Sequence, residues 1–555
     1  MARGCNGRGR FVLIITNAWS GLLGREPVVT TRIRWRGQSS ISLTEPITRL
    51  PPFQAKGVIA IENHDFPAAY WLANPNGDFE HSGAVGLGSF NTKKGIDLEI
   101  PLGSIPPASS TPNILSLSHR DSARLYGLGQ NNDHITLLDA FGGLGFSAPG
   151  SPHENWHAQE AIVSRRHFFE RDPSVTKVTV VIDGLFEWCQ QNPVQEISRF
   201  EGNKWLGTEI SATSDALEDI PLFSSDTATI SLSPVVTNCG GELPLKTMSL
   251  KSDYHLTFQF MGEPPTLSEA VDEQIVPVRD FLSLLMGFRA EILSISLTLA
   301  EDGSPIKVYI PFVEANHEDL PKHAKREMPF TFLKVKDKLQ PMLEDWFSLP
   351  DDARRAAGIL LSMLSNERSL YLDSKFIAAA CAFEALSRVG HNVNELPPER
   401  FNENLDVIKR SISNARIRKW ALYKLKCANS TPAGVLTQKM LDELEPYASH
   451  VIPDRQRFET DHRLARNAYV HQNGNLVNGI VPSGQDLRTH TEAVLFLVWG
   501  KLLNILGITP QELIDALGSS FFHWNDLHRA QKMYAKKQKE GGSSCDSASP
   551  IDSIE

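Results

Sequence analysis

The sequence predicts a protein of two regions, a mainly β region with one long helix, followed by an all-α helical bundle. Over residues 51–315 the apolar residues come in short runs rich in β-branched side chains, which is typical of strands. After residue 334 the apolar spacing changes to about 3.6 residues, the period of an α-helix. Between the two regions, the polar stretch 314–329 has no apolar face to bury, which is typical of a linker.

The composition is that of a folded soluble protein, with 41% hydrophobic and 22% charged residues in 555. The formal net charge of −10 excludes general attraction to nucleic acid, so a polyanion site must be a local patch. The six cysteines form no C-x-x-C pair and no metal-ligand spacing, as expected in a reducing cytosol. No apolar run approaches the roughly 18 residues of a membrane span. We therefore expect a cytoplasmic protein with no cofactor and no membrane partner.

Turn residues separate the predicted strands of the first region. These strands are 57–62, 97–103, 177–184, 229–237, 254–260, 290–300 and 306–314. The long helix among them opens with a capping box of Thr266 and Glu269, and Pro277 is expected to kink it or to end its first half. Residues 1–50 are predicted to be an N-terminal arm rather than a secretion signal, because their apolar run is short.

The second region is predicted to form a bundle over residues 351–530. A linker and connecting helix at 316–350 precede it, and a disordered tail at 531–555 follows. The predicted helices are 334–347, 351–365, 370–389, 402–412, 414–428, 434–445, 455–473 and 484–507, then one opened by Thr509.

The helix at 373–390 is apolar nearly all round, which indicates the centre of the bundle. Its only charged residue between Phe376 and Ser387 is Glu384. A carboxylate removed from water needs a partner, so we expect Glu384 to meet an arginine or a backbone amide. The alternative is a helix rolled far enough to leave this carboxylate in solvent.

Candidate chemistry is concentrated in the stretch HRLARNAYVHQNG, residues 462–474. Arg463, Asn467 and His471 follow one another at intervals of four residues and stack on one helical face. Arg466 precedes His471 by five residues, which places it about 140° away round the helix. Only a long side chain or a second chain would bring this guanidinium to the imidazole. A working site is therefore expected to be completed across a helix–helix or dimer interface.

A histidine and an arginine are the minimum set for cleaving RNA without a metal. The histidine removes the proton of a 2′-hydroxyl, whose oxygen attacks the adjacent phosphorus, and the arginine stabilises the charge on the phosphate. The product would carry a 2′,3′-cyclic phosphate. From the residues alone, however, Arg466 and His471 are more typical of a solvated helix face.

The pattern RNAYVH at 466–471, far downstream of the helix that carries Glu384, resembles the R-x-x-x-x-H signature of HEPN domains. The first region resembles the N-terminal domain of ApeA-type phage-defence proteins. This second resemblance depends on ITLLDAFGG at 135–143 and on TKVTVVIDGLFEWCQ at 176–190, a strand that leads into a Leu-x-x-Trp segment. Together the resemblances cover about residues 55–525.

The resemblance implies a homodimeric, metal-independent endoribonuclease that acts in abortive infection. It implies catalysis by Arg466 and His471, supported by Asn467, Arg463 and Glu384. The substrate would be RNA, with tRNA among the candidates, and the first region would respond to a phage-derived trigger. A non-catalytic HEPN-like module that binds a nucleotide or a protein is the alternative.

A basic stretch supports RNA binding independently. Residues 409–426, KRSISNARIRKWALYKLK, contain seven basic residues and no acid. Arg416, Lys419, Tyr423 and Lys426 fall on one helical face, where the tyrosine can stack on a base. The alternative is a solvated face whose charges are paired with acids elsewhere in the fold.

A remote alternative, a zinc peptidase, comes from SPHENWHAQE. His153, Glu154 and His157 form an H-E-x-x-H pattern, which in a helix places two zinc ligands beside a general base. The flanking residues suit a loop and a strand better than a helix, and neither His167 nor Glu170 has the spacing of a third ligand. We therefore predict no metal site.

Overall fold

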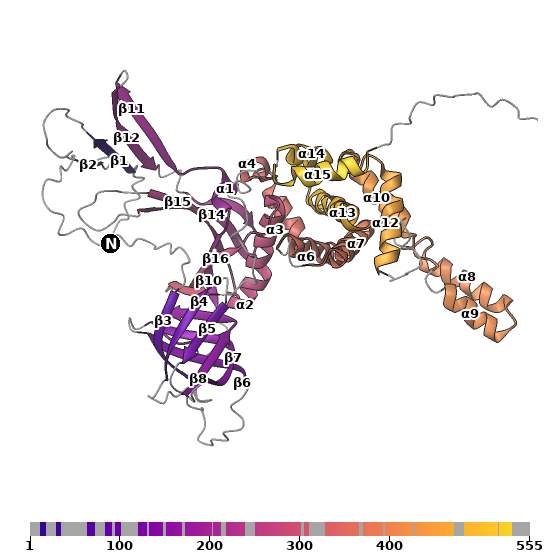
Figure 1. The fold of residues 1–555 in the computed structure, drawn as a ribbon, viewed down its shortest axis with the longest axis horizontal. Helices are drawn as coiled ribbons and strands as arrows, with labels where there is room; N and C mark the ends of the chain where they lie inside the picture. Colours follow the sequence, from indigo (N-terminus) through magenta and orange to yellow (C-terminus); the bar gives the residue numbers. More distant parts are fainter. Residues whose placement is uncertain are drawn as a thin grey trace, which may run out of the picture. The chain divides into compact units, whose positions relative to one another are not determined.

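A computed structural model describes the chain in the following segments: 11–17, 29–34, 64–72, 84–91, 95–100, 120–129, 133–147, 151–168, 173–201, 204–212, 218–238, 250–300, 305–309, 328–365, 370–391, 394–425, 428–470, 482–519 and 521–535. The chain divides into two compact units, Met1–Phe347 and Ser348–Glu555. The first unit is built mainly from strands and the second from helices (Figure 1). The predicted fold class is therefore confirmed.

The strands of the first unit are β1 (Phe11–Asn17), β2 (Val29–Arg34), β3 (His64–Leu72), β4 (Ala84–Asn91), β5 (Gly95–Ile100), β6 (Arg120–Gly129), β7 (His134–Ser147), β8 (Ser151–Ala158), β9 (Glu160–Ser164), β10 (Val175–Ile182), β11 (Val194–Glu201), β12 (Lys204–Ala212), β13 (Ile220–Ser224), β14 (Ala228–Asn238), β15 (Leu250–Phe260), β16 (Ile292–Leu299) and β17 (Pro305–Tyr309). Its helical segments are α1 (Leu185–Cys189), α2 (Leu267–Ala270), the π-helical turn η3 (Val271–Ile275), α3 (Val276–Met286), α4 (Phe332–Val335) and α5 (Leu339–Phe347).

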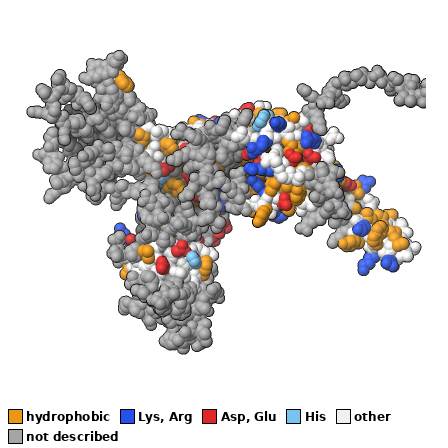
Figure 2. Space-filling model, viewed as in Figure 1, with side chains coloured by type: hydrophobic (Ala, Val, Ile, Leu, Met, Phe, Trp, Pro, Cys, Tyr) orange, Lys and Arg blue, Asp and Glu red, His pale blue; other side chains and the backbone are white. Residues whose placement is uncertain are grey.

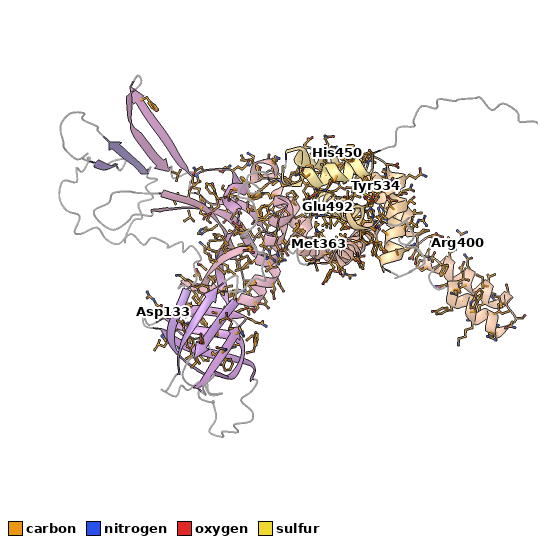
Figure 3. The ribbon with its side chains drawn as sticks, in the orientation of Figure 1. Asp133, Met363, Arg400, His450, Glu492 and Tyr534 are labelled. Atoms are coloured by element: carbon orange, nitrogen blue, oxygen red, sulfur yellow. The ribbon has the colours of Figure 1, made fainter. Side chains whose placement is uncertain are left out.

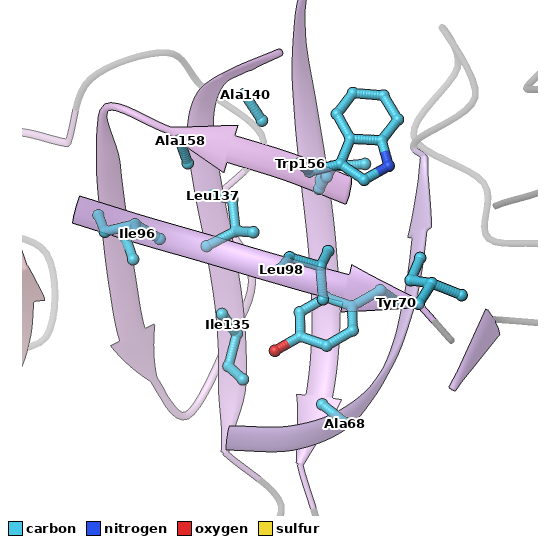
Figure 4. Close-up of a cluster of buried hydrophobic side chains, with 12 residues drawn as sticks. Ala68, Tyr70, Ile96, Leu98, Ile135, Leu137, Ala140, Trp156 and Ala158 are labelled. Carbon is cyan, nitrogen blue, oxygen red and sulfur yellow. The ribbon is translucent and has the colours of Figure 1, made fainter. Parts of the chain in front are cut away.

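Six of the described strands close into an antiparallel barrel. Strand β3 pairs with β4, β4 with β5, β5 with β8, β8 with β7, β7 with β6, and β6 with β3. Buried side chains fill the barrel, among them Tyr70, Leu98 and Trp156 (Figure 4). The barrel needs glycine at Gly142, because a Cβ there would lie 2.3 Å from the carbonyl oxygen of Asn155 on the neighbouring strand.

Strand β7 connects the barrel to the rest of the sheet. Its residues 134–138 pair with β9 and its residues 141–147 pair with β8. Asp139 lies between these segments with a φ of 47°, a left-handed conformation that aspartate adopts more readily than most residues. From β9 the sheet continues through β17, β16, β10, β15 and β14 to β13. A second sheet has the order β11-β12-β1-β2, so the predicted N-terminal arm contributes two strands.

The long helical segment of the first unit begins with the predicted capping box of Thr266 and Glu269. The π-helical turn η3 precedes Pro277, so the helical path continues past the proline instead of ending there. The segment 328–347, which contains α4 and α5, also belongs to this unit. Trp188 Nε1 donates a hydrogen bond to the carbonyl oxygen of Phe330 at 2.8 Å, and Trp346 Nε1 donates one to Pro277 at 2.9 Å.

The described end of the predicted linker and connecting helix, residues 328–347, is therefore packed on the β-rich unit. Within it, Met328 and Phe330 are buried, which gives the segment the apolar anchor that the polar run before it lacks. Residues 314–327 of the predicted linker, residues 310–314 of the predicted strand 306–314, and the predicted strand 57–62 lie outside the described residues.

The helices of the second unit are α6 (Asp351–Ser365), α7 (Leu372–Arg388), α8 (Pro398–Ser411), α9 (Ala415–Leu425), α10 (Ala433–Glu443), α11 (Tyr447–Val451), α12 (Arg455–Val470), α13 (Gly484–Ile505), α14 (Pro510–Ser519) and α15 (Phe521–Met533). Helix α7 contacts α6, α10, α12 and α13, which confirms its predicted central place. Helix α15 extends to Met533 and Tyr534 is fully buried, so these residues belong to the bundle rather than to the predicted tail. None of the described helices combines the length and apolar character that a membrane span requires.

Candidate functional site

Helix α12 carries the candidate residues and is held against α7 by aromatic packing. The ring of Phe376 on α7 lies 5.6 Å from that of Tyr469, centroid to centroid, in an edge-on arrangement. Phe383, further along α7, lies 5.0 Å from the ring of His462. Ala465 between these contacts is fully buried. This packing turns one side of α12 toward α7 and fixes the direction in which its polar residues project.

Arg466 of α12 is bound to Glu384 of α7. Its Nε and Nη2 atoms both donate to carboxylate oxygen Oε2, at 3.0 and 2.7 Å. The other carboxylate oxygen, Oε1, accepts a hydrogen bond from Nη2 of Arg388 at 2.5 Å. The side chains of Arg466 and Glu384 are 30% and 23% exposed, so water shields this pair only in part. The prediction that Glu384 meets an arginine is confirmed, and its partner is the arginine of the R-x-x-x-x-H motif.

The charges of this cluster do not cancel. One carboxylate, Glu384, holds the two guanidinium groups of Arg388 and Arg466, and the exposed Arg463 lies on the same helix as Arg466. Arg388 was not predicted as a partner of Glu384, although it follows Glu384 by four residues, the spacing of a helical ion pair. A surface with excess guanidinium groups suits an anion such as a phosphate.

The structure places only part of the predicted catalytic set. Arg466 and Asn467 are half-buried on α12, and Arg463 is exposed there. His471 lies outside the described residues, so its pairing with Arg466 stays a prediction.

A buried chain of polar side chains links α12 to α13 and to the end of α15. His462 Nδ1 lies 3.3 Å from His490 Nε2, and His490 Nδ1 lies 2.6 Å from the hydroxyl of Tyr534. Figure 3 labels Tyr534. Burial, and then the charge of Arg466, lowers the pKa of His462 to about 4. Burial also lowers the pKa of His490 well below its usual value. Both rings are therefore neutral near pH 7, and their role is to hold α12 in place.

The predicted RNA-binding residues Arg416, Lys419 and Tyr423 are exposed on α9. Lys426, the fourth, lies outside the described residues. Helices α8 and α9 contain no buried residue, unlike the helices of the bundle core. Trp420 was not among the predicted RNA-binding residues, but it is 61% exposed on the same helix. The signal for it was its position between Lys419 and Tyr423 in the basic stretch.

The H-E-x-x-H segment is strand β8, so the helical geometry of a zinc peptidase motif is absent. Neighbouring side chains alternate between the two faces of a strand, which separates the glutamate of such a pattern from its histidines. His157 Nδ1 is paired with Asp97 of β5. Among the described residues, no group of three or more His, Cys, Asp or Glu side chains is arranged to hold a metal ion. The structure therefore removes the basis of the zinc peptidase alternative.

A comparison with protein families matches residues 71–346 to the model of ApeA N-terminal domain 1. The matched segment begins at the end of β3 and covers strands β4 to β17 and helices α1 to α5, except for the last residue of α5. No match was found among curated proteins or among solved structures.

Proposed function

Because this chain is an ApeA-like protein, with the ApeA N-terminal domain at residues 71–346, we propose that it serves anti-phage defence as a metal-independent endoribonuclease of the HEPN type. The helical unit is the proposed nuclease, and the β-rich unit is the proposed sensor of a phage-derived trigger. Cleavage of cellular RNA, with tRNA among the candidates, would stop growth of the infected cell, as in abortive infection.

The observation that carries this proposal is the Arg466 guanidinium bound to Glu384. Arginine has five N–H donors, and the carboxylate engages only those on Nε and Nη2. The donors on Nη1 have no hydrogen bond to any described residue, so they are available to a phosphate oxygen. Arg388 adds a second positive charge to the same carboxylate, which leaves the cluster with a net positive charge.

The proposed reaction uses His471 as the base and Arg466 as the phosphate ligand. His471 takes the proton of a 2′-hydroxyl, and the 2′-oxygen forms a bond to the adjacent phosphorus. The bond from phosphorus to the 5′-oxygen breaks, and that oxygen leaves as a hydroxyl after it takes a proton from water. Arg466 stabilises the charge that grows on the other phosphate oxygens. The products are a 2′,3′-cyclic phosphate and a 5′-hydroxyl end.

A homodimer is part of the proposal. His471 follows Arg466 by five positions in the sequence, a spacing that on a continuous helix corresponds to a rotation of about 140°. The side chain of Arg466 is moreover bound to Glu384 of its own chain. A second helical unit that presents its His471 would complete the site without breaking that contact.

The deciding experiment is incubation of RNA with the full chain in EDTA. Wild-type protein is expected to cut RNA and leave cyclic phosphate ends, whereas His471→Ala is expected to lose this activity. His528→Ala, a change at an exposed histidine of the same unit, is the matched control and should cut like wild type. Full activity of His471→Ala would show that His471 is not the catalytic base. RNA binding without cleavage by wild type would favour the alternative, a non-catalytic binding module.

A further inference from the structure

Helices α8 and α9 form a hairpin inserted between α7 and α10 of the bundle. Asn429 closes its base: its side-chain amide donates to the carbonyl oxygen of Leu396 at 2.9 Å and accepts from the Leu396 N–H at 2.8 Å. The carbonyl oxygen of Asn429 also accepts from the N–H of Glu395, at 2.8 Å. Arg400, labelled in Figure 3, lies near this base. The hairpin therefore has a fixed attachment, while both of its helices are open to solvent.

The hairpin carries a run of positive charge that begins at the end of α8 and continues through α9, whereas its acids, Glu399, Glu403 and Asp406, all precede this run on α8. No Asp or Glu occurs between Asp406 and Asp442, although the chain has a net charge of −10. The described cations of this run are Lys409, Arg410, Arg416, Arg418, Lys419 and Lys424. None of them forms an ion pair with a described residue, and the side chains of Arg410 and Arg418 donate hydrogen bonds to backbone carbonyl oxygens. No described acid is therefore paired with a cation of this run.

Two large aromatic side chains are exposed among these cations. Trp420 is 61% exposed and Tyr423 is 74% exposed. Arg416, Lys419, Trp420 and Tyr423 are spaced by three, four and seven residues, which places them on one face of α9, here named the α9 face. Figure 2 shows hydrophobic and basic side chains next to one another on this hairpin. Aromatic rings interleaved with cations are the features that bind unpaired bases and phosphates.

We propose that the α9 face binds single-stranded RNA, with Trp420 and Tyr423 stacking on unpaired bases and Arg416 and Lys419 contacting phosphates. This inference rests on the proposed function and narrows its substrate to RNA with unpaired bases, such as a loop. A duplex keeps its bases stacked inside the helix, so it cannot offer them to these rings. The absence of any acid on this face favours a polyanion over a protein partner.

The test measures binding of the full chain to a fluorescent, unstructured 2′-O-methyl RNA, which cannot be cut by 2′-hydroxyl attack. Trp420→Ala and Tyr423→Ala are each expected to weaken this binding by about tenfold or more, and Trp420→Phe is expected to retain most of it. The double variant Arg416→Ala, Lys419→Ala should depend less on salt than wild type. The negative slope of log K against log salt should become smaller in magnitude by about 1.4. A duplex of the same sequence should bind Trp420→Ala and wild type alike.

Val407→Ala is the matched control, because Val407 is 54% exposed on α8 and is not part of the α9 face. The proposal is overturned if Trp420→Ala binds the single-stranded probe as tightly as wild type does. It is also overturned if Trp420→Ala loses affinity equally for single strand and duplex. A change in oligomer size in place of RNA binding would show that the face docks a second copy of the chain, and would also overturn it. Since the probe is not cleaved, wild-type protein that cleaves ordinary RNA but does not bind the probe would refute this inference alone. Wild-type protein that binds the probe but does not cleave ordinary RNA would refute only the nuclease.

Discussion

Arg466 and Glu384 are joined by two hydrogen bonds that end on the same carboxylate oxygen, at 3.0 and 2.7 Å. The bonds connect helices α12 and α7, which lie 82 residues apart at this point of the chain. A guanidinium already held in one orientation needs little reorganisation when a phosphate arrives, which is the condition for electrostatic stabilisation of a transition state. In the proposed nuclease, Glu384 would therefore be a positioning residue for the arginine rather than a group that contacts RNA.

The first prediction concerns that positioning role. In Glu384→Gln, the guanidinium of Arg466 loses a charge-assisted bond, so cleavage should fall by about 10- to 100-fold, the effect of about 1.5–3 kcal/mol. The RNA concentration at half-maximal rate should change little, because the α9 face is untouched. Arg388→Gln is the comparison. It removes one positive charge from the cluster but leaves Arg466 bound to Glu384, so it should reduce cleavage less than Glu384→Gln does. Equal loss in both variants would argue against a specific role for the Arg466 contact.

The second prediction tests whether the site is shared between two chains. Arg466→Ala and His471→Ala are each expected to be inactive alone. Co-expressed in equal amounts, they should recover about a quarter of wild-type activity, because half of the dimers are mixed and each mixed dimer holds one intact site. Light scattering would establish the dimer and the cleavage assay the recovery. No recovery from a confirmed mixed dimer would place Arg466 and His471 of one chain in the same site.

Much of the helical unit was predictable because its signals are local. The predicted helix at 351–365 has the observed bounds of α6, and the predicted helix at 484–507 differs from α13 only at its end. Helix α11 was not predicted, since five residues are too few to show a period. The barrel was not predicted either. Its strands β7 and β8 contain adjacent glycines and polar residues, and their closure depends on pairings distant in sequence.

The candidate site shows the same division between local and distant information. The need of Glu384 for a partner followed from the apolar helix around it, but the identity of that partner depends on how α12 packs against α7. The chain of His462, His490 and Tyr534 was not predicted for the same reason, because its members come from three separate parts of the sequence. The local sequence contained the signals for Trp420, within the basic stretch, and for Arg388, four residues after Glu384, but neither residue was predicted.

The third prediction compares two helical glycines. A Cβ on Gly500 of α13 would lie 2.3 Å from Cε1 of Tyr447, whose hydroxyl is fixed by a 2.8 Å bond to the carbonyl oxygen of Phe496. Gly500→Ala should therefore destabilise the helical unit by about 1–2 kcal/mol, although alanine favours a helix. Gly358→Ala on α6, where the Cβ meets nothing within 4 Å, should stabilise it by about 0.5–1 kcal/mol. Urea unfolding followed by circular dichroism measures both, and the same sign for the two variants would contradict the packing argument.

The fourth prediction is a loss of stability in mild acid. Burial lowers the pKa of His462 to about 4 in the folded state, whereas an unfolded histidine titrates near pH 6.5. Between these values the unfolded chain binds more protons, so the free energy of unfolding must fall as the pH drops from about 6.5 to about 4. For His462 this loss is on the order of 3 kcal/mol, and His490, whose pKa is also lowered by burial, adds to it.

The measurement for this last prediction is the unfolding free energy of the helical unit between pH 7 and pH 4.5. His462→Gln removes one titrating ring, so its stability should depend less steeply on pH than that of wild type, even though the lost contact with His490 lowers it at pH 7. His528→Gln changes an exposed histidine and should follow the wild-type curve. Because His462 lies on the same helix as Arg466, one turn away, the acid transition should also end RNA cleavage. Identical pH dependence of wild type and His462→Gln would mean that the buried ring does not titrate in this window.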